Sequence, residues 1–83
     1  MRISYTKHAL EKLKRQDIRN FKITKKTIRK ILIHAGSKSR TKYGAFSVVS
    51  QTDLLHDLRV VYVIIEEEIK VITFHIARKG RYK

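Results

Sequence analysis

Residues near the C-terminus follow a pattern typical of two adjacent β-strands. Residues 60–65 are β-branched or aromatic at every position, and residues 69–76 nearly so, which fits a pleated, half-buried surface. Three consecutive glutamates, residues 66–68, separate the two runs. Carboxylates are not buried without partners, so these glutamates mark a solvent-exposed turn. The pattern therefore predicts a β-hairpin that turns at the glutamates.

Side chains on successive strand residues point to opposite faces, so the second run divides into two sets. One face carries Lys70, Ile72, Phe74, Ile76 and Arg78. The other face carries Ile69, Val71, Thr73, His75 and Ala77. We expect the first face to be the core face, because its centre is entirely apolar. The second face is mixed and ends in the polar pair Thr73 and His75, so we expect it to stay available for binding.

Two helices are predicted in the N-terminal half, each marked by apolar residues at helical spacing. The first covers residues 7–16 and follows Thr6, a good N-cap. The second follows Thr24, which can also cap, and stops at Gly36. Residues 17–22 form a polar connector between the two helices.

The remaining segments complete a small sheet. Residues 2–5 are expected to form a short strand, residues 37–43 either a loop or an edge strand, and residues 45–51 a further strand. At 83 residues the chain is one domain with one small core. We predict an α+β fold spanning residues 1–83, with a short N-terminal strand and two helices on one face of a three- to four-stranded antiparallel sheet.

Charge is divided unevenly along the chain, whose formal net charge is +13. Residues 1–46 hold fourteen Lys or Arg and two acidic residues, whereas residues 47–77 hold two and five. Residues 78–83 add four more positive charges. A basic half and a basic tail beside a neutral-to-acidic sheet attract polyanions, nucleic acid first among them. The alternative is a basic protein whose charge only keeps it soluble.

Several kinds of chemistry find no support in the sequence. The chain has no cysteine, and none of its four histidines stands at metal-ligand spacing from another. It has no glycine-rich phosphate loop, no Gly-x-Ser-x-Gly motif and no catalytic pair of carboxylates. We therefore expect no metal and no cofactor. Because no signal peptide or membrane-spanning run is found, we expect a cytoplasmic protein without a membrane partner.

Metal-independent RNA cleavage requires none of these motifs or metal sites. It needs a base for the ribose 2′-hydroxyl, positive charge for the phosphate and a proton for the leaving oxygen. Histidine suits the proton transfers, arginine the phosphate, and tyrosine can stack on a base or donate a proton. The candidate catalytic residues are His75, Arg59, Arg78, Arg81 and Tyr82. If the hairpin forms, Arg59 lies near His75 or beyond it.

Further basic residues are candidates for sequence-independent contacts with the RNA backbone. They are Lys12, Lys26, Lys30, Lys38, Arg40, Lys42, Lys79 and Lys83. Each assignment has a plainer alternative. His75 could be a half-buried strand histidine, Arg59 could pair with Asp57, and the basic tail could be an ordinary solvated C-terminus.

The chain also resembles the RelE/ParE superfamily of type II toxins, BrnT-like members included. The resemblance covers almost the whole chain and is carried by residues 6–13 (TKHALEKL), 60–63 (VVYV), 71–74 (VITF) and 78–82 (RKGRY). It implies a RelE-like α+β domain over residues 1–83. It also implies a toxin, often an mRNA endoribonuclease, that an antitoxin neutralises. By resemblance, Arg59, Arg78 or Arg81, and Tyr82 occupy places comparable to those of superfamily ribonucleases. His8 matches a histidine that BrnT-like proteins carry in an early helix, so it joins the RNA-binding candidates.

One departure from the superfamily stands out. The lysines that such enzymes place on the middle strands are missing from residues 45–51. We expect a toxin-like RNA-binding protein that acts as an mRNA endoribonuclease on free or ribosome-bound mRNA, with an acidic antitoxin as partner. Two alternatives stay open: a non-catalytic nucleic-acid-binding module, and an inhibitor of a protein target such as gyrase.

Overall fold

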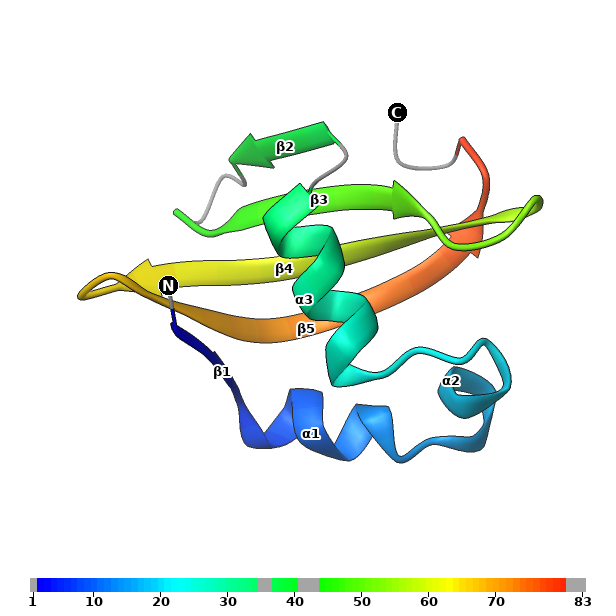
Figure 1. Ribbon diagram of the computed structural model, residues 1–83, viewed down its shortest axis with the longest axis horizontal. Helices are drawn as coiled ribbons and strands as arrows, with labels where there is room; N and C mark the ends of the chain where they lie inside the picture. The colour runs from blue at the N-terminus through cyan, green and yellow to red at the C-terminus, as the bar shows by residue number, and fades with distance from the viewer. Residues whose placement is uncertain (1, 35–36, 41–43, 81–83) are drawn as a thin grey trace.

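The computed structural model describes residues 2–34, 37–40 and 44–80, and these form three helices and five strands. The elements follow in the order β1 (Arg2–Tyr5), α1 (Lys7–Leu13), α2 (Gln16–Asn20), α3 (Lys25–His34), β2 (Ser37–Arg40), β3 (Phe46–Gln51), β4 (His56–Ile65) and β5 (Glu68–Arg78). The expected α+β class is confirmed. Figure 1 shows the sheet lying behind α3, with α1 and α2 below its β5 side.

The strands form one sheet in the order β1-β5-β4-β3-β2. Strands β2 to β5 pair in antiparallel fashion, but β1 pairs with β5 in parallel, with Arg2 opposite Glu68 and Tyr5 opposite Val71. The sheet is therefore mixed, and the prediction of a purely antiparallel sheet is corrected. Residues 37–43 were compatible with a loop or an edge strand, and residues 37–40 form the edge strand β2.

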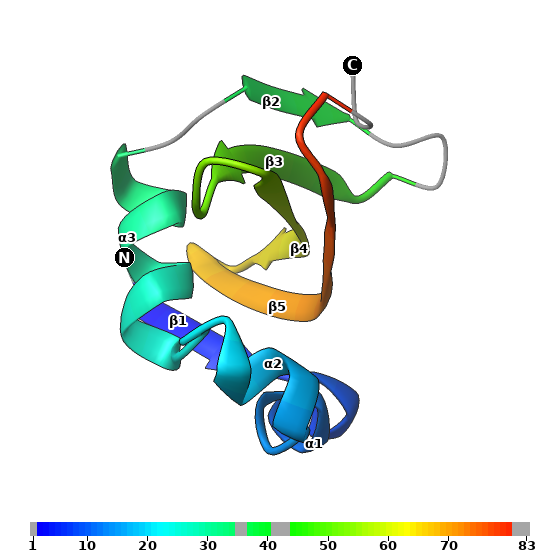
Figure 2. The same ribbon diagram turned by 90° about the vertical axis from the view of Figure 1, so that its right-hand side faces the viewer.

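The helices are distributed differently from the prediction of two on one face. Helix α3 crosses one face of the sheet and buries Ile28, Ile31 and Leu32. Helix α1 instead follows the edge strand β1 and lies beside β5, with α2 next to it (Figures 1 and 2). The expected connector contains the short helix α2, because Ile18 is 3% exposed and anchors this segment to the core. Helix α1 accordingly ends at Leu13, earlier than predicted.

The β4–β5 hairpin turns at the glutamates, as predicted. Ile65 opposes Glu68, which leaves Glu66 and Glu67 as the two turn residues. Both have positive φ, 49° and 64°. A two-residue turn with positive φ at both positions matches the twist of paired strands, but it usually carries Asn and Gly. The turn is therefore built from residues that disfavour its backbone conformation.

A β-bulge interrupts the same hairpin and changes which residues reach the core. Val61 opposes Thr73, but the next residue, Tyr62, opposes Val71, so Ile72 is an extra residue on β5. Both Val71 and Phe74 are 0% exposed. The strict alternation predicted for this strand is therefore wrong before Thr73, where it placed Val71 on the available face.

Thr6 joins the bulge to the start of α1. Its hydroxyl donates to the carbonyl of Ile72 at 2.9 Å and accepts from the Ala9 amide at 3.1 Å, while its own amide donates to the Val71 carbonyl at 3.0 Å. The predicted N-cap is confirmed. Because the same side chain holds both elements, it fixes where α1 begins along β5.

Candidate nucleic-acid interface

Arg59 and His75 are directly opposite each other on β4 and β5. The neighbouring pair, Val60 and Phe74, is fully buried under the helices, so Arg59 and His75 point to the other face of the sheet. His75 is exposed there, and Arg59 is partly exposed. The sequence-based expectation that Arg59 lies near His75 is confirmed.

Helix α1 adds two side chains to this place. The His8 Nε2 atom lies 3.2 Å from the Thr73 hydroxyl, and the Lys12 Nζ atom lies 3.1 Å from Nδ1 of His75. Together, these side chains form the sheet cluster: His8, Lys12, Arg59, Thr73 and His75. It combines two side chains from α1, one from β4 and two from β5.

The Lys12 ammonium is held between an aromatic ring and the imidazole. Its Nζ atom lies 5.4 Å from the centre of the Phe74 ring and also meets Nδ1 of His75. Partial burial lowers the pKa of Lys12, and the charge of Arg15 lowers it further, against an opposing effect of Asp17. A charged ammonium carries only donors, so Nδ1 of His75 must accept and the imidazole proton resides on Nε2.

The pKa of His75 lies below its ordinary value of 6.5. The main cause is partial loss of hydration, followed by the positive charges of Lys12, Arg59 and His8. His75 is therefore neutral at neutral pH while a lysine and an arginine stand beside it. A neutral imidazole suits a base, and the two cations suit the phosphate next to which that base would act.

The other predicted site residues do not join the sheet cluster. Arg78 is opposite His56 and lies four residues after Phe74, so its side chain is on the helix-covered face of the sheet. This position does not support the prediction that Arg78 acts beside His75. Lys26 and Lys30 are on α3, on that same face, and Lys79 is exposed beyond the end of β5. Lys38 and Arg40 belong to the edge strand β2.

Lys42, Arg81, Tyr82 and Lys83 lie outside the described residues. One member of the sheet cluster, Thr73, was missed as a site residue. The sequence did contain a sign of it, because Thr73 and His75 are two residues apart and therefore lie on the same face of the strand. His8 and Lys12 were expected to bind RNA, but their position beside His75 depends on how α1 aligns with β5.

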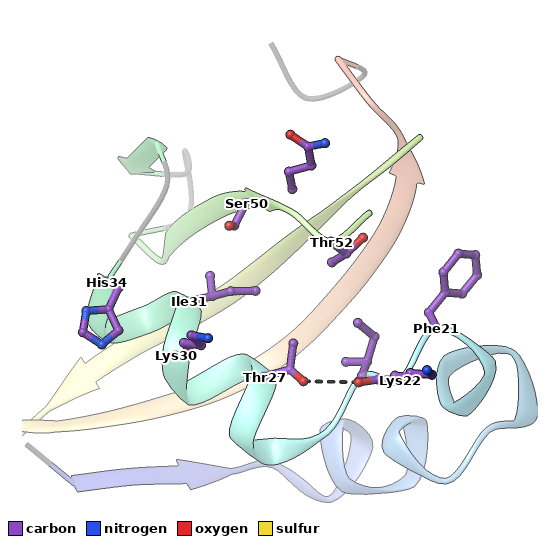
Figure 3. A pocket seen from close by; sticks show the side chains of 10 residues that line it. Phe21, Lys22, Thr27, Lys30, Ile31, His34, Ser50 and Thr52 are labelled. Atoms are coloured by element: carbon purple, nitrogen blue, oxygen red, sulfur yellow. Dashed lines mark hydrogen bonds between the residues drawn. The ribbon is translucent and has the colours of Figure 1, made fainter. Parts of the chain in front are cut away.

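A separate pocket of ≈ 500 Å³ opens between α3 and the end of β3, on the helix-covered side of the sheet (Figure 3). Its basic side chains are Lys22, Lys30 and His34. Its apolar side chains are Phe21, Ile23 and Ile31. The volume falls within the range of typical ligand pockets.

Comparisons with protein-family models, with curated proteins and with solved structures find no match for this chain. Among residues 2–34, 37–40 and 44–80, no group of three or more His, Asp or Glu side chains is placed to hold a metal ion. In the same ranges, no helix has the length and apolar character needed to cross a membrane.

Proposed function

We propose that the protein is a toxin-like RNA-binding protein of the RelE type that acts in the cytoplasm and cleaves RNA without a metal ion. The sheet cluster supports this proposal. The observation that carries it is the position of His75, whose Nδ1 lies 3.1 Å from the Lys12 ammonium and which is opposite Arg59 on the neighbouring strand. These three side chains provide a base and cations for the phosphorane charge in transesterification by the ribose 2′-hydroxyl. In that step the 2′-oxygen bonds to phosphorus, the bond from phosphorus to the 5′-oxygen breaks, and the leaving 5′-oxygen takes its proton from water.

Each member of the sheet cluster has a role in this proposal. Arg59 and Lys12 bind the scissile phosphate and stabilise the charge that develops on it. His75 accepts the proton of the 2′-hydroxyl, because its lowered pKa leaves the imidazole neutral at neutral pH. His8 and Thr73, which contact each other at 3.2 Å, bind the adjoining part of the RNA backbone.

A non-catalytic RNA-binding module is the second candidate, and one observation favours it. The His75 Nδ1 lone pair already accepts from Lys12, and the other ring nitrogen carries the proton. In that arrangement His75 has no free lone pair with which to take a proton. The module would then use the same cations to hold phosphates without breaking a bond.

We also propose that the pocket between α3 and β3 binds an acidic partner protein, as an antitoxin would be. Besides Ser50, its hydroxyl and amide side chains already donate hydrogen bonds: Thr27 to the Lys22 carbonyl, Thr52 to the His56 carbonyl, and Gln51 to the Asp53 carbonyl. The pocket therefore offers mainly an apolar floor and cations, which suits an apolar side chain flanked by carboxylates better than the polar edge of a base.

The experiment is RNA cleavage by the purified protein in the presence of a chelator, with and without ribosomes. His75→Gln should abolish cleavage, and the matched control His34→Gln, an exposed histidine at the end of α3, should leave it unchanged. RNA binding by the wild-type protein without cleavage under either condition would reject the nuclease and support the binding module. Cleavage that survives His75→Gln would reject the assigned base.

A further inference from the structure

The contact between Lys12 and His75 points to control of the proposed base by the substrate itself. We propose that Lys12 is a positioning residue that occupies the Nδ1 lone pair of His75 until an RNA phosphate binds and takes over the lysine's hydrogen bond. This inference rests on the proposed function of the sheet cluster, and it adds a mechanism by which the base becomes available only beside RNA.

The argument begins with hydrogen-bonding capacity. The Lys12 ammonium has three N–H donors and no acceptor, and its Nζ atom lies 3.1 Å from Nδ1 of His75. The imidazole therefore accepts at Nδ1 and carries its proton at Nε2. While this hydrogen bond persists, neither ring nitrogen of His75 can take a proton from a 2′-hydroxyl.

A phosphate is the stronger acceptor for that ammonium. A hydrogen bond between two charged groups is stronger than one between a charged and a neutral group, so a phosphate oxygen competes successfully with a neutral imidazole. When Lys12 donates to the phosphate, no proton changes place, but the Nδ1 lone pair becomes free. His75 can then accept the 2′-hydroxyl proton at Nδ1.

The charges around His75 also make it a stronger base once a phosphate is bound. The charged and titratable groups that lower the pKa of His75 are Lys12 and His8 on α1 and Arg59 on β4. A bound phosphate adds a negative charge among them and offsets their effect. The proton affinity of His75 therefore rises when RNA binds, at the moment when the base is needed.

The test is ¹⁵N NMR of His75, which reports the protonated nitrogen and the pKa, with a 2′-O-methylated RNA tetranucleotide as probe. This probe carries phosphodiesters but lacks the nucleophile, so it cannot be cleaved. In the free wild-type protein we expect the proton on Nε2, and adding the probe should raise the pKa of His75. In Lys12→Met the pKa should already be higher without the probe, and the probe should raise it less.

Two further variants separate this role from general charge or folding effects. Lys14→Met removes an exposed lysine of the same helix end and should behave as wild type. Lys12→Arg keeps a pure donor at the site and should restore the Nε2-protonated form. An Nδ1-protonated His75 in the free protein, or equal pKa values in wild type and Lys12→Met, would overturn the proposal. Cleavage of unmodified RNA is measured separately, so loss of this role alone would leave the proposed function standing.

Discussion

The Lys12 Nζ atom lies 3.1 Å from Nδ1 of His75, because four residues of α1 and two residues of β5 cover nearly the same length. His8 and Lys12 are one helical turn apart, about 6 Å along the axis, and Thr73 and His75 are two strand residues apart, about 6.6 Å. Since the chain leaves the parallel strand β1 directly into α1, the helix continues in the direction of β5. The same spacing therefore pairs His8 with Thr73 and Lys12 with His75.

Removing the Thr6 hydroxyl should loosen this alignment. Thr6→Ala loses the cap on Ala9 and the bond to the Ile72 carbonyl, and we expect the free energy of unfolding to fall by about 1–2 kcal/mol. Urea unfolding measures the loss, and the conservative variant Thr6→Ser should retain most of the stability. A Thr6→Ala protein as stable as wild type would show that this junction does not hold α1 on β5.

Two substitutions in the turn of the β4–β5 hairpin should make the folded protein more stable. Replacing Glu66 by Asn and Glu67 by Gly puts residues that tolerate positive φ at both turn positions. We expect the double variant to gain about 1 kcal/mol in the free energy of unfolding. The matched control, Glu66→Gln with Glu67→Gln, removes the charges but keeps the backbone preference, and it should give little gain. An equal gain in both variants would assign the effect to charge.

Folding stability should depend on pH through His75. The pKa of His75 in the folded protein lies below 6.5, so the unfolded chain binds this proton first as the pH falls. The free energy of unfolding should therefore decrease as the pH drops below about 6.5, until the lowered folded pKa is passed. Unfolding titrations between about pH 7.5 and pH 5.5 measure this slope. His75→Gln should flatten it, and an unchanged slope in the variant would contradict the assigned shift.

RNA binding should be strongly salt-dependent, with the charges of the sheet cluster contributing to the slope. Each phosphate contact on a single strand contributes about 0.7 to the slope of log affinity against log salt concentration. Arg59→Gln should reduce the slope by about that amount. Lys26→Gln, on α3 and away from the cluster, should leave it nearly unchanged. Equal reductions in the two variants would indicate diffuse attraction to the whole basic surface.

Local sequence patterns were sufficient for much of the hairpin. The glutamates located its turn, and from that turn the proximity of Arg59 and His75 followed, because register in a hairpin is set by the turn. The bulge at Ile72 could not be predicted this way. It depends on burying both Val71 and Phe74, and on Thr6, which lies far away in the sequence and takes up the Ile72 carbonyl.

The composition of the sheet cluster was only partly predictable for a similar reason. His8 and Lys12 could be recognised as basic residues on one helix, but their pairing with Thr73 and His75 depends on the parallel strand β1. A purely antiparallel sheet, the expected arrangement, gives no reason to place α1 beside β5. The face of Arg78 was predictable from the sequence, because alternation along the strand places its side chain on the same face as Phe74 and on the other face from His75.

The most direct test of the central claim is an NMR titration with the 2′-O-methylated RNA tetranucleotide, followed at the amide and side-chain signals of every assigned residue. If the sheet cluster is the RNA site, the largest shifts will fall on His8, Lys12, Arg59, Thr73 and His75, while the signals of α3 change little. Shifts concentrated on α3 and the pocket beside it, with the sheet cluster unaffected, would contradict the account.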